Sequence, residues 1–289
     1  MAEANHQGAL PPVIVRLPEG KALPLVCDSP HSGTVYPADF GAAIPAARLR
    51  GGEDTHVDAL WAAVPAVGGT LLAATFPRVY IDPNRMADDI DPDQLDGAWP
   101  TALAPGPKTS LGYGLVWSRI DASTPIYDRR LSVAEVQGRL DRYYRPYHAA
   151  LAEAVEGAYR RFGAVWHLNL HSMPNNAYER LKIDSPHPLA DFVLGDRDGT
   201  TCEPGLVDLV DRELRNMGYT VARNDPYKGV QLIAQIGRPA ERRSSLQIEI
   251  RRPLYMDEAT RKRNAGFDTL QHDLGRLAEQ VAAYIRASL

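Results

Sequence analysis

Two histidines in this sequence follow short apolar runs that end in turn-forming residues. His31 lies in a Ser-Pro-His-Ser-Gly segment directly after the run at residues 23–28, and His171 follows the run at 164–170 and precedes Ser-Met-Pro. An apolar run that stops at small and polar residues is typical of a buried strand that ends at a working surface. Open α/β sheets place their sites at the carboxyl ends of strands, so both histidines are candidates for chemistry.

Alternation along the second run separates two nearby histidines. In an extended chain alternate side chains share a face, so His167, Asn169 and His171 point the same way. A rise of about 3.3 Å per residue leaves His167 about 13 Å from His171, so one metal ion cannot contact both. We expect His171 to be the ligand. A lone histidine at a strand end is more often a structural, hydrogen-bonded residue, and partners elsewhere in the chain decide between the two interpretations.

A carboxylate that could join the two histidines lies in the segment 51–58. Glu53 or Asp54 precedes a predicted helix that runs to about residue 66, where either carboxylate could instead cap the helix or favour its dipole. Two histidines and one carboxylate suit a catalytic zinc ion, which leaves its fourth position to water. Zinc moves the pKa of that water toward neutrality, and an adjacent carboxylate can take the proton.

Glu249 is the candidate for the proton-accepting carboxylate. It lies in the alternating run at residues 246–250, where Gln247 and Glu249 face away from the apolar side chains. The alternative is a surface glutamate paired with Arg251 or Arg252, which follow closely in the chain.

Strands that alternate with helices must position these residues. We expect strands at residues 13–17, 23–28, 70–76, 78–82, 164–171, 192–195, 219–222 and 246–250. We expect helices at residues 51–66, 132–161 with a capping box at its start and a kink near Pro146, 202–216 and 256–288. The segment 86–126 has little periodicity and is typical of a loop that covers a site. This order predicts an α/β sandwich with helices on both faces of the sheet.

The composition limits the other possibilities. With 289 residues, 44% hydrophobic and 24% charged, we expect one domain over residues 1–289 with a loosely ordered tail at 1–10. A net charge of −4 gives no electrostatic reason to expect nucleic acid or a membrane as partner. Cys27 and Cys202 cannot build a disulfide framework, and the sequence shows no signal pattern or long apolar run, so we expect a cytoplasmic protein.

Several short motifs occur together in one order. They are Pro-His-Ser-Gly at 30–33, Glu-Asp-Thr-His-Val-Asp at 53–58, Arg-Val-Tyr-Ile-Asp-Pro-Asn-Arg at 78–85, Tyr-Tyr-Arg-Pro-Tyr-His at 143–148, His-Ser-Met at 171–173, Gln-Ile-Glu-Ile at 247–250 and Tyr-Met-Asp-Glu at 255–258. This ordered set, over residues 23–260, resembles the N-formylglutamate amidohydrolase family, which is distantly similar to zinc carboxypeptidases and aspartoacylases. The resemblance implies a three-layer α/β/α sandwich around a mixed, mostly parallel sheet of the phosphorylase/hydrolase-like kind. It also implies one zinc ion and hydrolysis of an N-acyl bond on an amino acid.

The resemblance also implies roles for individual residues. The metal ligands match His31, Asp54 and His171. Glu53 or His56 replaces Asp54 if the register is shifted by a residue or two, and Glu249 matches the general base.

Basic residues match the positions that would hold the substrate. Asn84 and Arg85 resemble the Asn-Arg pair with which related carboxypeptidases hold a substrate carboxylate, and the planar fork of arginine suits that task. Arg78 is the candidate to stabilise the oxyanion, with Arg251 less favoured. Lys228, in a Lys-Gly pair kept from the family pattern, is a further substrate-binding candidate.

Three departures from the family pattern concern the substrate rather than the metal. Ala234 stands where the pattern has an arginine, Asn169 stands where it has an aspartate, and the segment 86–126 is unlike the corresponding loops. These departures leave the exact substrate open. The sequence does not indicate an oligomeric state.

The leading hypothesis is zinc-dependent hydrolysis of an N-formyl or N-acyl amino acid, with N-formylglutamate cleaved to glutamate and formate as the favoured reaction. A small-molecule substrate is the expected partner. One alternative is a deacylase or carboxypeptidase-like zinc hydrolase of another small substrate. Another is a serine or cysteine hydrolase that uses Ser32 or Cys27, which the lack of a Gly-x-Ser-x-Gly elbow disfavours. The last is a catalytically silent ligand-binding relative, against which the intact set of candidate ligands argues.

Overall fold

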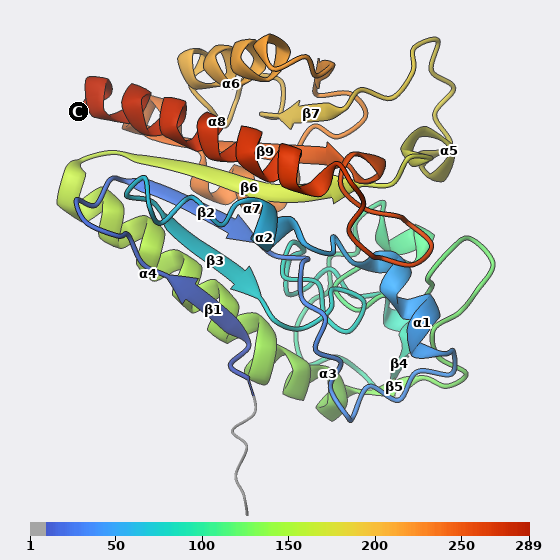
Figure 1. The fold of residues 1–289 in the computed structure, drawn as a ribbon. Helices are drawn as coiled ribbons and strands as arrows, with labels where there is room; N and C mark the ends of the chain where they lie inside the picture. Colours follow the sequence, from blue (N-terminus) through green and yellow to red (C-terminus); the bar gives the residue numbers. More distant parts are fainter. Residues whose placement is uncertain (1–9) are drawn as a thin grey trace, which may run out of the picture.

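The computed structural model describes residues 10–289 and contains a seven-stranded sheet, shown in Figure 1. In spatial order its strands are β1 (Val13–Arg16), β3 (Thr70–Ala74), β2 (Leu25–Ser29), β6 (Val165–Met173), β9 (Arg243–Arg251), β7 (Phe192–Gly195) and β8 (Val221–Arg223). β1 is antiparallel to β3 and β7 is antiparallel to β9, while the other neighbours are parallel. The sheet is therefore mixed, and β3, β2, β6 and β9 end at the same edge. A second, two-stranded sheet pairs β4 (Leu95–Asp96) with β5 (Leu131–Ser132).

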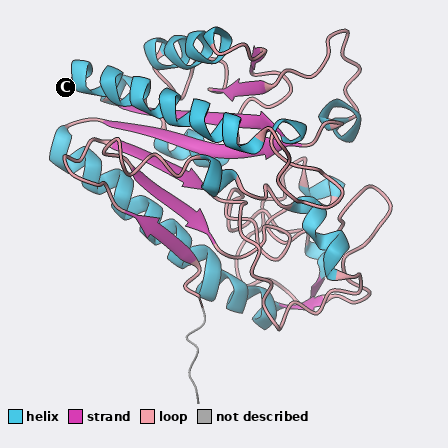
Figure 2. Cartoon of the chain, viewed as in Figure 1, coloured by secondary structure: helices cyan, strands magenta, loops and turns pink. Residues whose placement is uncertain are grey.

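Helices flank the sheet, as Figure 2 shows in cyan. The α-helices are α1 (Ala46–Leu49), α2 (Val57–Leu60), α3 (Val133–Arg139), α4 (Arg145–Phe162), α5 (Ala177–Leu181), α6 (Pro204–Asn216), α7 (Gln231–Ile236) and α8 (Phe267–Ser288). Side chains of α2, α6 and α8 form one buried cluster with the sheet, and side chains of α3, α4 and α7 form a second. Among residues 10–289, no helix has the length and apolar character needed to cross a bilayer.

The two clusters divide the residues of β6 as strand alternation requires. Trp166, Leu168 and Leu170 belong to the cluster with α2, α6 and α8. His167, Asn169 and His171 alternate with them and therefore point to the other face. The predicted separation of the apolar and polar residues of this strand is confirmed.

The predicted helix at 132–161 is confirmed with a change of form in its middle. The hydroxyl of Ser132 accepts a hydrogen bond from the amide of Glu135 at 3.1 Å, which caps α3. A π-helical turn (Leu140–Tyr144) joins α3 to α4 directly before Pro146. Because proline lacks an N–H and its ring crowds the carbonyl one turn earlier, a wider turn accommodates it there.

Two predicted helices begin or end elsewhere. The helix expected at 51–66 is only one turn, α2, because Pro65 disfavours helical backbone at the preceding residue and the chain continues in turns. Neither Glu53 nor Asp54 caps α2, which has no side-chain cap. The last helix begins at Phe267 rather than at 256, because Arg261 adopts φ 60° and interrupts the helical backbone.

The strand expected at 78–82 is wrong, because the segment forms turns. Pro77 and Pro83 bracket it, and the amide of Tyr80 bonds to the carbonyl of Pro77 at 3.0 Å. The tight path brings the guanidinium of Arg78 to 2.7 Å from the carboxylate of Asp82.

The segment 86–126 contains little regular structure and is nevertheless packed, with Ile90, Leu115 and Val116 buried in the cluster with α4. Apart from residue 10, the tail expected at 1–10 lies outside the described residues.

Candidate active site

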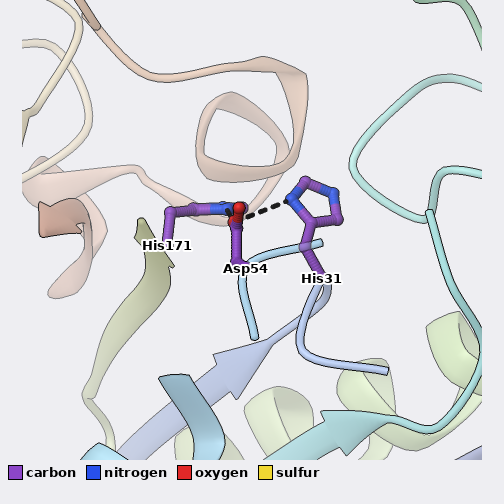
Figure 3. A group of neighbouring side chains, drawn as sticks. All are labelled: His31, Asp54 and His171. Carbon is purple, nitrogen blue, oxygen red and sulfur yellow. Dashed lines mark hydrogen bonds and ion pairs between the residues drawn. The ribbon is translucent and has the colours of Figure 1, made fainter. Parts of the chain in front are cut away.

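Three side chains from separate parts of the chain meet at the carboxyl edge of the sheet (Figure 3). His31 follows β2, Asp54 precedes α2, and His171 lies on β6. Nδ1 of His31 and Nδ1 of His171 lie 3.3 Å and 3.2 Å from Oδ2 of Asp54. One ligand atom of each residue lies within 4.8 Å of the others, and all three residues are buried. Two imidazole nitrogens and one carboxylate oxygen at this spacing suit a single divalent metal ion.

Both histidine rings are held by their outer nitrogens. Nε2 of His31 lies 2.7 Å from Oδ1 of Asp82, and Nε2 of His171 lies 2.7 Å from Oδ1 of Asn169. In the neutral rings that a metal ion binds, these oxygen acceptors favour the proton on Nε2, which leaves the lone pair of each Nδ1 facing Asp54. Nδ1 of His31 is buried without a hydrogen-bond partner among residues 10–289. Histidines held this way by a carboxylate or amide oxygen are typical of metal sites.

The orientation of Asn169 depends on a buried network behind it. Its amide donates to Oδ1 of Asp28 at 2.8 Å, which leaves the amide oxygen for His171. Asp28 also accepts from Tyr147 at 2.6 Å and lies 2.8 Å from Nε2 of His167. Burial raises the pKa of Asp28, but these hydrogen bonds outweigh it and lower the pKa overall. His167 is thus a structural histidine that supports the network.

The alternatives to Asp54 point elsewhere. The carboxylate of Glu53 accepts hydrogen bonds from Tyr36 at 2.8 Å and Thr55 at 2.8 Å, and it pairs with a nearby arginine. Nε2 of His56 lies 2.9 Å from the backbone carbonyl oxygen of Arg261. Oδ1 of Asp54 is held at 2.9 Å by Arg252. Burial raises the pKa of Asp54, but His171, His31 and this arginine hold it well below its usual range.

Tight packing positions the turn that carries His31. At Gly33, a Cβ would lie 2.2 Å from the carbonyl oxygen of Phe76, so only glycine allows the backbone to approach this closely. The neighbouring hydroxyl of Ser32 contacts Ser29 at 3.0 Å. Burial raises the pKa of the Cys27 thiol well above its ordinary value. Among residues 10–289, neither Ser32 nor Cys27 has a hydrogen bond to a histidine that could act as its base, so this geometry argues against the nucleophilic alternative.

Glu249 lies beside His171 in the sheet. The two residues are partners in the register of β6 and β9, so their side chains share a face. Gln247 donates to the carboxylate of Glu249 at 3.1 Å. Glu249 is 8% exposed, and its burial, assisted by Asp54, raises its pKa against the opposing charge of His171. Arg251 and Arg252 pair with other carboxylates, so the surface ion-pair interpretation of Glu249 is wrong.

These side chains open onto a cavity of about 310 Å³. That volume lies at the lower end of the range for small-molecule sites, about 300–1,000 Å³. Among the residues that line it are His31, His171, Glu249, Gln247, Asn84, Arg78, Arg85, Lys108, Tyr113, Trp117, Arg180, Tyr227, Lys228 and Arg252. The segment 86–126 supplies Lys108, Tyr113 and Trp117, which agrees with its expected role as a covering loop.

Three residues expected to contact substrate line the cavity wall near the histidines. The amide nitrogen of Asn84 lies 2.9 Å from Nε2 of His171, and its Oδ1 is buried without a partner among the described residues. Arg85 is 8% exposed and donates to the carbonyls of Tyr113 at 2.9 Å and Asn84 at 3.0 Å. Its guanidinium makes no ion pair with a carboxylate among residues 10–289, although it is buried. Arg78 is held by Asp82.

Two other basic residues that were expected to contact the substrate are paired with carboxylates away from the three candidate metal ligands. The ammonium of Lys228 pairs with Asp198 at 2.9 Å, and the guanidinium of Arg251 pairs with Asp191. Sequence reasoning missed Lys108, for which the only signal was its position in the long covering loop.

Sequence reasoning also assigned no role in the site to Asp82 or Arg252, which hold His31 and Asp54. Asp82 lies within the motif at residues 78–85, but only the turn geometry brings its carboxylate to the candidate ligand His31. Burial raises its pKa, and the charges of Arg78 and His31 outweigh this and hold it well below its usual range.

Comparisons with known proteins point to one family. Residues 23–256 match the family model described as N-formylglutamate amidohydrolase. N-formylglutamate deformylases from Pseudomonas aeruginosa and Pseudomonas putida are each 26% identical over 246 and 244 residues, which is 82% of this chain and 83% of each relative. The crystal structure of an N-formylglutamate amidohydrolase from Ralstonia eutropha JMP134 is 80% identical with a TM-score of 0.96, covering 97% of this chain and 100% of that chain. A gene product from Agrobacterium tumefaciens, 18% identical, shares the fold with a TM-score of 0.64 over 96% of each chain.

Proposed function

This chain belongs to the N-formylglutamate amidohydrolase family, and we propose on that premise that it hydrolyses N-formylglutamate to glutamate and formate with the help of zinc. The observation that carries the proposal is the buried set of His31, Asp54 and His171 at the wall of a small, basic cavity beside Glu249. The 80% identical amidohydrolase supports the substrate, and the donor set supports the metal.

We propose His31, Asp54 and His171 as the zinc ligands. Their facing atoms are two imidazole nitrogens and one carboxylate oxygen, and the buried Nδ1 of His31 has no other partner among the described residues. When bound, zinc would polarise the formyl carbonyl and lower the pKa of a water. Asp82 and Asn169 keep the two rings in the tautomer that such binding needs.

Glu249 is the proposed general base. Its buried carboxylate takes a proton from the attacking water as the new C–O bond forms at the formyl carbon. It then returns that proton to the leaving nitrogen as the C–N bond breaks, which releases formate and the free amine of glutamate. The raised pKa of Glu249 suits a group that both accepts and donates a proton. Arg78 is the proposed donor to the carbonyl oxygen as it gains negative charge.

Asn84 and Arg85 are proposed to hold the α-carboxylate of the substrate. Asn84 contacts His171, so this pair lies close to where the scissile bond must be. Arg85 carries a shielded guanidinium without a carboxylate partner among the described residues, and a planar fork binds a carboxylate through two parallel hydrogen bonds.

We further propose a single domain over residues 1–289 built as a three-layer α/β/α sandwich of the phosphorylase/hydrolase-like kind. The continuous sheet from β1 to β8 and the helices on both of its faces support this description.

Formate release from N-formyl-L-glutamate by the purified protein tests the proposal, with zinc content measured on the same sample. We expect turnover and about one zinc per chain. Two alternative substrates are assayed separately: N-acetyl-L-glutamate for deacylase activity and a dipeptide for carboxypeptidase-like activity. Faster turnover of either would favour the deacylase or carboxypeptidase-like alternative, and no turnover of any would favour a silent relative.

A further inference from the structure

The cavity wall carries more positive charge than the carboxylates around it neutralise. Its basic side chains are Arg78, Arg85, Lys108, Arg180, Lys228 and Arg252. Three of them make ion pairs at 2.7–2.9 Å, as Arg78 does with Asp82, Arg252 with Asp54 and Lys228 with Asp198. The other three have no ion pair with any carboxylate in residues 10–289.

The three unpaired cations differ in shielding. Arg180 is exposed, whereas Arg85 is buried and Lys108 is partly buried. A shielded cation without a partner is costly, so two such groups in one small cavity indicate a ligand with two negative charges. The proposed α-carboxylate contact accounts only for Arg85.

The covering loop holds Lys108 in a defined place. The carboxylate of Asp89 accepts hydrogen bonds from the amide of Gly106 at 2.7 Å and from the hydroxyl of Thr109, on either side of Lys108. The carbonyl of Lys108 accepts from the amide of Tyr113 at 2.9 Å. Its ammonium lies 5.7 Å from the centre of the Tyr227 ring, which also lines the cavity.

The charges around Lys108 also favour an anion there. Burial, and then the charges of Arg85 and Arg78, lower the pKa of Lys108 to about 8, against the opposing effect of Glu249 and Asp82. A bound carboxylate would offset the cost of burying the ammonium group and its repulsion by the two arginines.

We infer that Lys108 binds the side-chain carboxylate of an acidic N-acyl amino acid and thereby selects dicarboxylic substrates. The inference rests on the proposed function and assigns its substrate selectivity to the covering loop. The α-carboxylate lies two bonds from the scissile nitrogen, so it belongs with Arg85, next to Asn84 and His171. The second carboxylate is further along the substrate and meets Lys108 on the loop.

Kinetics of Lys108→Met on a matched pair of substrates test this inference. N-formyl-L-glutamine has the shape of N-formyl-L-glutamate without the second charge. We expect kcat/KM for N-formyl-L-glutamate to fall about 30-fold or more, as for the loss of a desolvated charge pair, and kcat/KM for N-formyl-L-glutamine to change by less than about threefold. An equal loss on both substrates, or no loss on either, overturns the inference.

Three further variants separate selectivity from general damage. Lys108→Arg keeps the charge and should keep most of the preference for N-formyl-L-glutamate. Arg85→Lys should lower kcat/KM for both substrates alike, because both carry the α-carboxylate. Lys21→Met removes an exposed lysine outside the cavity and should change neither value.

Binding of the free amino acids keeps the inference separate from the proposed function. If the parent protein releases formate from neither substrate, the proposed hydrolysis is wrong, and calorimetry with L-glutamate and L-glutamine still tests the site. The parent should bind L-glutamate more tightly, and Lys108→Met should remove most of that preference. A parent protein without a preference for L-glutamate contradicts the role of Lys108.

Discussion

Glu249 is a carboxylate buried between a candidate metal centre and a basic cavity wall. Its neighbours act on it in opposite directions, since burial and Asp54 favour the protonated form while His171, Lys108 and Arg78 favour the charged form. A group balanced in this way can exchange a proton during each turnover.

Replacing Glu249 by glutamine tests its role as base. Glu249→Gln keeps the size and shape of the side chain but removes the carboxylate that accepts a proton, so zinc content should be retained while kcat falls by about 10²-fold or more. Metal analysis and formate release measure the two quantities. Activity within a few-fold of the parent would falsify the assignment and leave Glu249 a structural role.

The pH dependence of selectivity tests Lys108 without a change of size or shape. Lys108 has a pKa of about 8, so its positive charge is present below pH 8 and is lost as the pH rises through that value. The ratio of kcat/KM for N-formyl-L-glutamate to that for N-formyl-L-glutamine should therefore fall between about pH 7 and 9.5. Groups that act on both substrates, such as Glu249, cancel in the ratio.

A control for this profile replaces the lysine by a residue that stays charged. In Lys108→Arg the ratio should remain nearly constant over the same range, because arginine does not lose its proton there. A ratio that is already flat in the parent contradicts the assignment.

At the scale of elements, β6 and β9 determine which polar groups meet. Their parallel register pairs His171 with Glu249, Asn169 with Gln247 and His167 with Ser245, all on one face. His167 lies on this face four residues before His171 and is therefore further from the edge of the sheet. Its ring contacts Asp28 instead of the candidate metal ligands.

A pair of histidine substitutions on β6 tests this division. His171→Ala should lower bound zinc and abolish hydrolysis while circular dichroism shows a folded chain. His167→Ala should leave zinc content unchanged and destabilise the fold by about 1–3 kcal/mol, because it removes a hydrogen bond from buried Asp28. Chemical denaturation and metal analysis of both variants check the outcome, and equal zinc binding in the two would mean that the metal site is misplaced.

At the scale of the molecule, the charge of the cavity is opposite to that of the chain. The sequence has a net charge of −4, yet among residues 10–289 the cavity wall has six basic residues, three of them without an ion pair, and one carboxylate, Glu249. Overall charge therefore says little about this substrate, whose recognition depends on local charges in a shielded cavity.

Removing the metal should be visible in the stability of the whole chain. The ligands come from three separate segments, so binding stabilises the native state by about 4 kcal/mol at a zinc concentration 1,000 times Kd. For a chain of this size that corresponds to a loss of about 8 °C in Tm after chelation, measured by scanning calorimetry. His171→Ala should show little response to the chelator, and a parent protein with the same insensitivity would argue against a metal held by this set.

The sequence alone determined the main elements and their buried faces. Alternation placed the apolar and polar sides of β6 correctly, and the Ser132 cap and Pro146 predicted the start and the irregular middle of a long helix. These features depend on neighbours in the chain, which a sequence shows directly. The same reasoning was wrong where proline and left-handed residues overrode periodicity, as at 78–82 and 256–266.

Only the tertiary structure decided which candidates come together. Glu53 and Asp54 are adjacent in sequence, and the turn before α2 brings Asp54 to the histidines while Glu53 binds Tyr36. Lys108 reaches the cavity because Asp89 fixes an otherwise irregular loop. Such contacts join residues far apart in the chain, and the free energy that selects them comes from packing and charge pairing that no local pattern records.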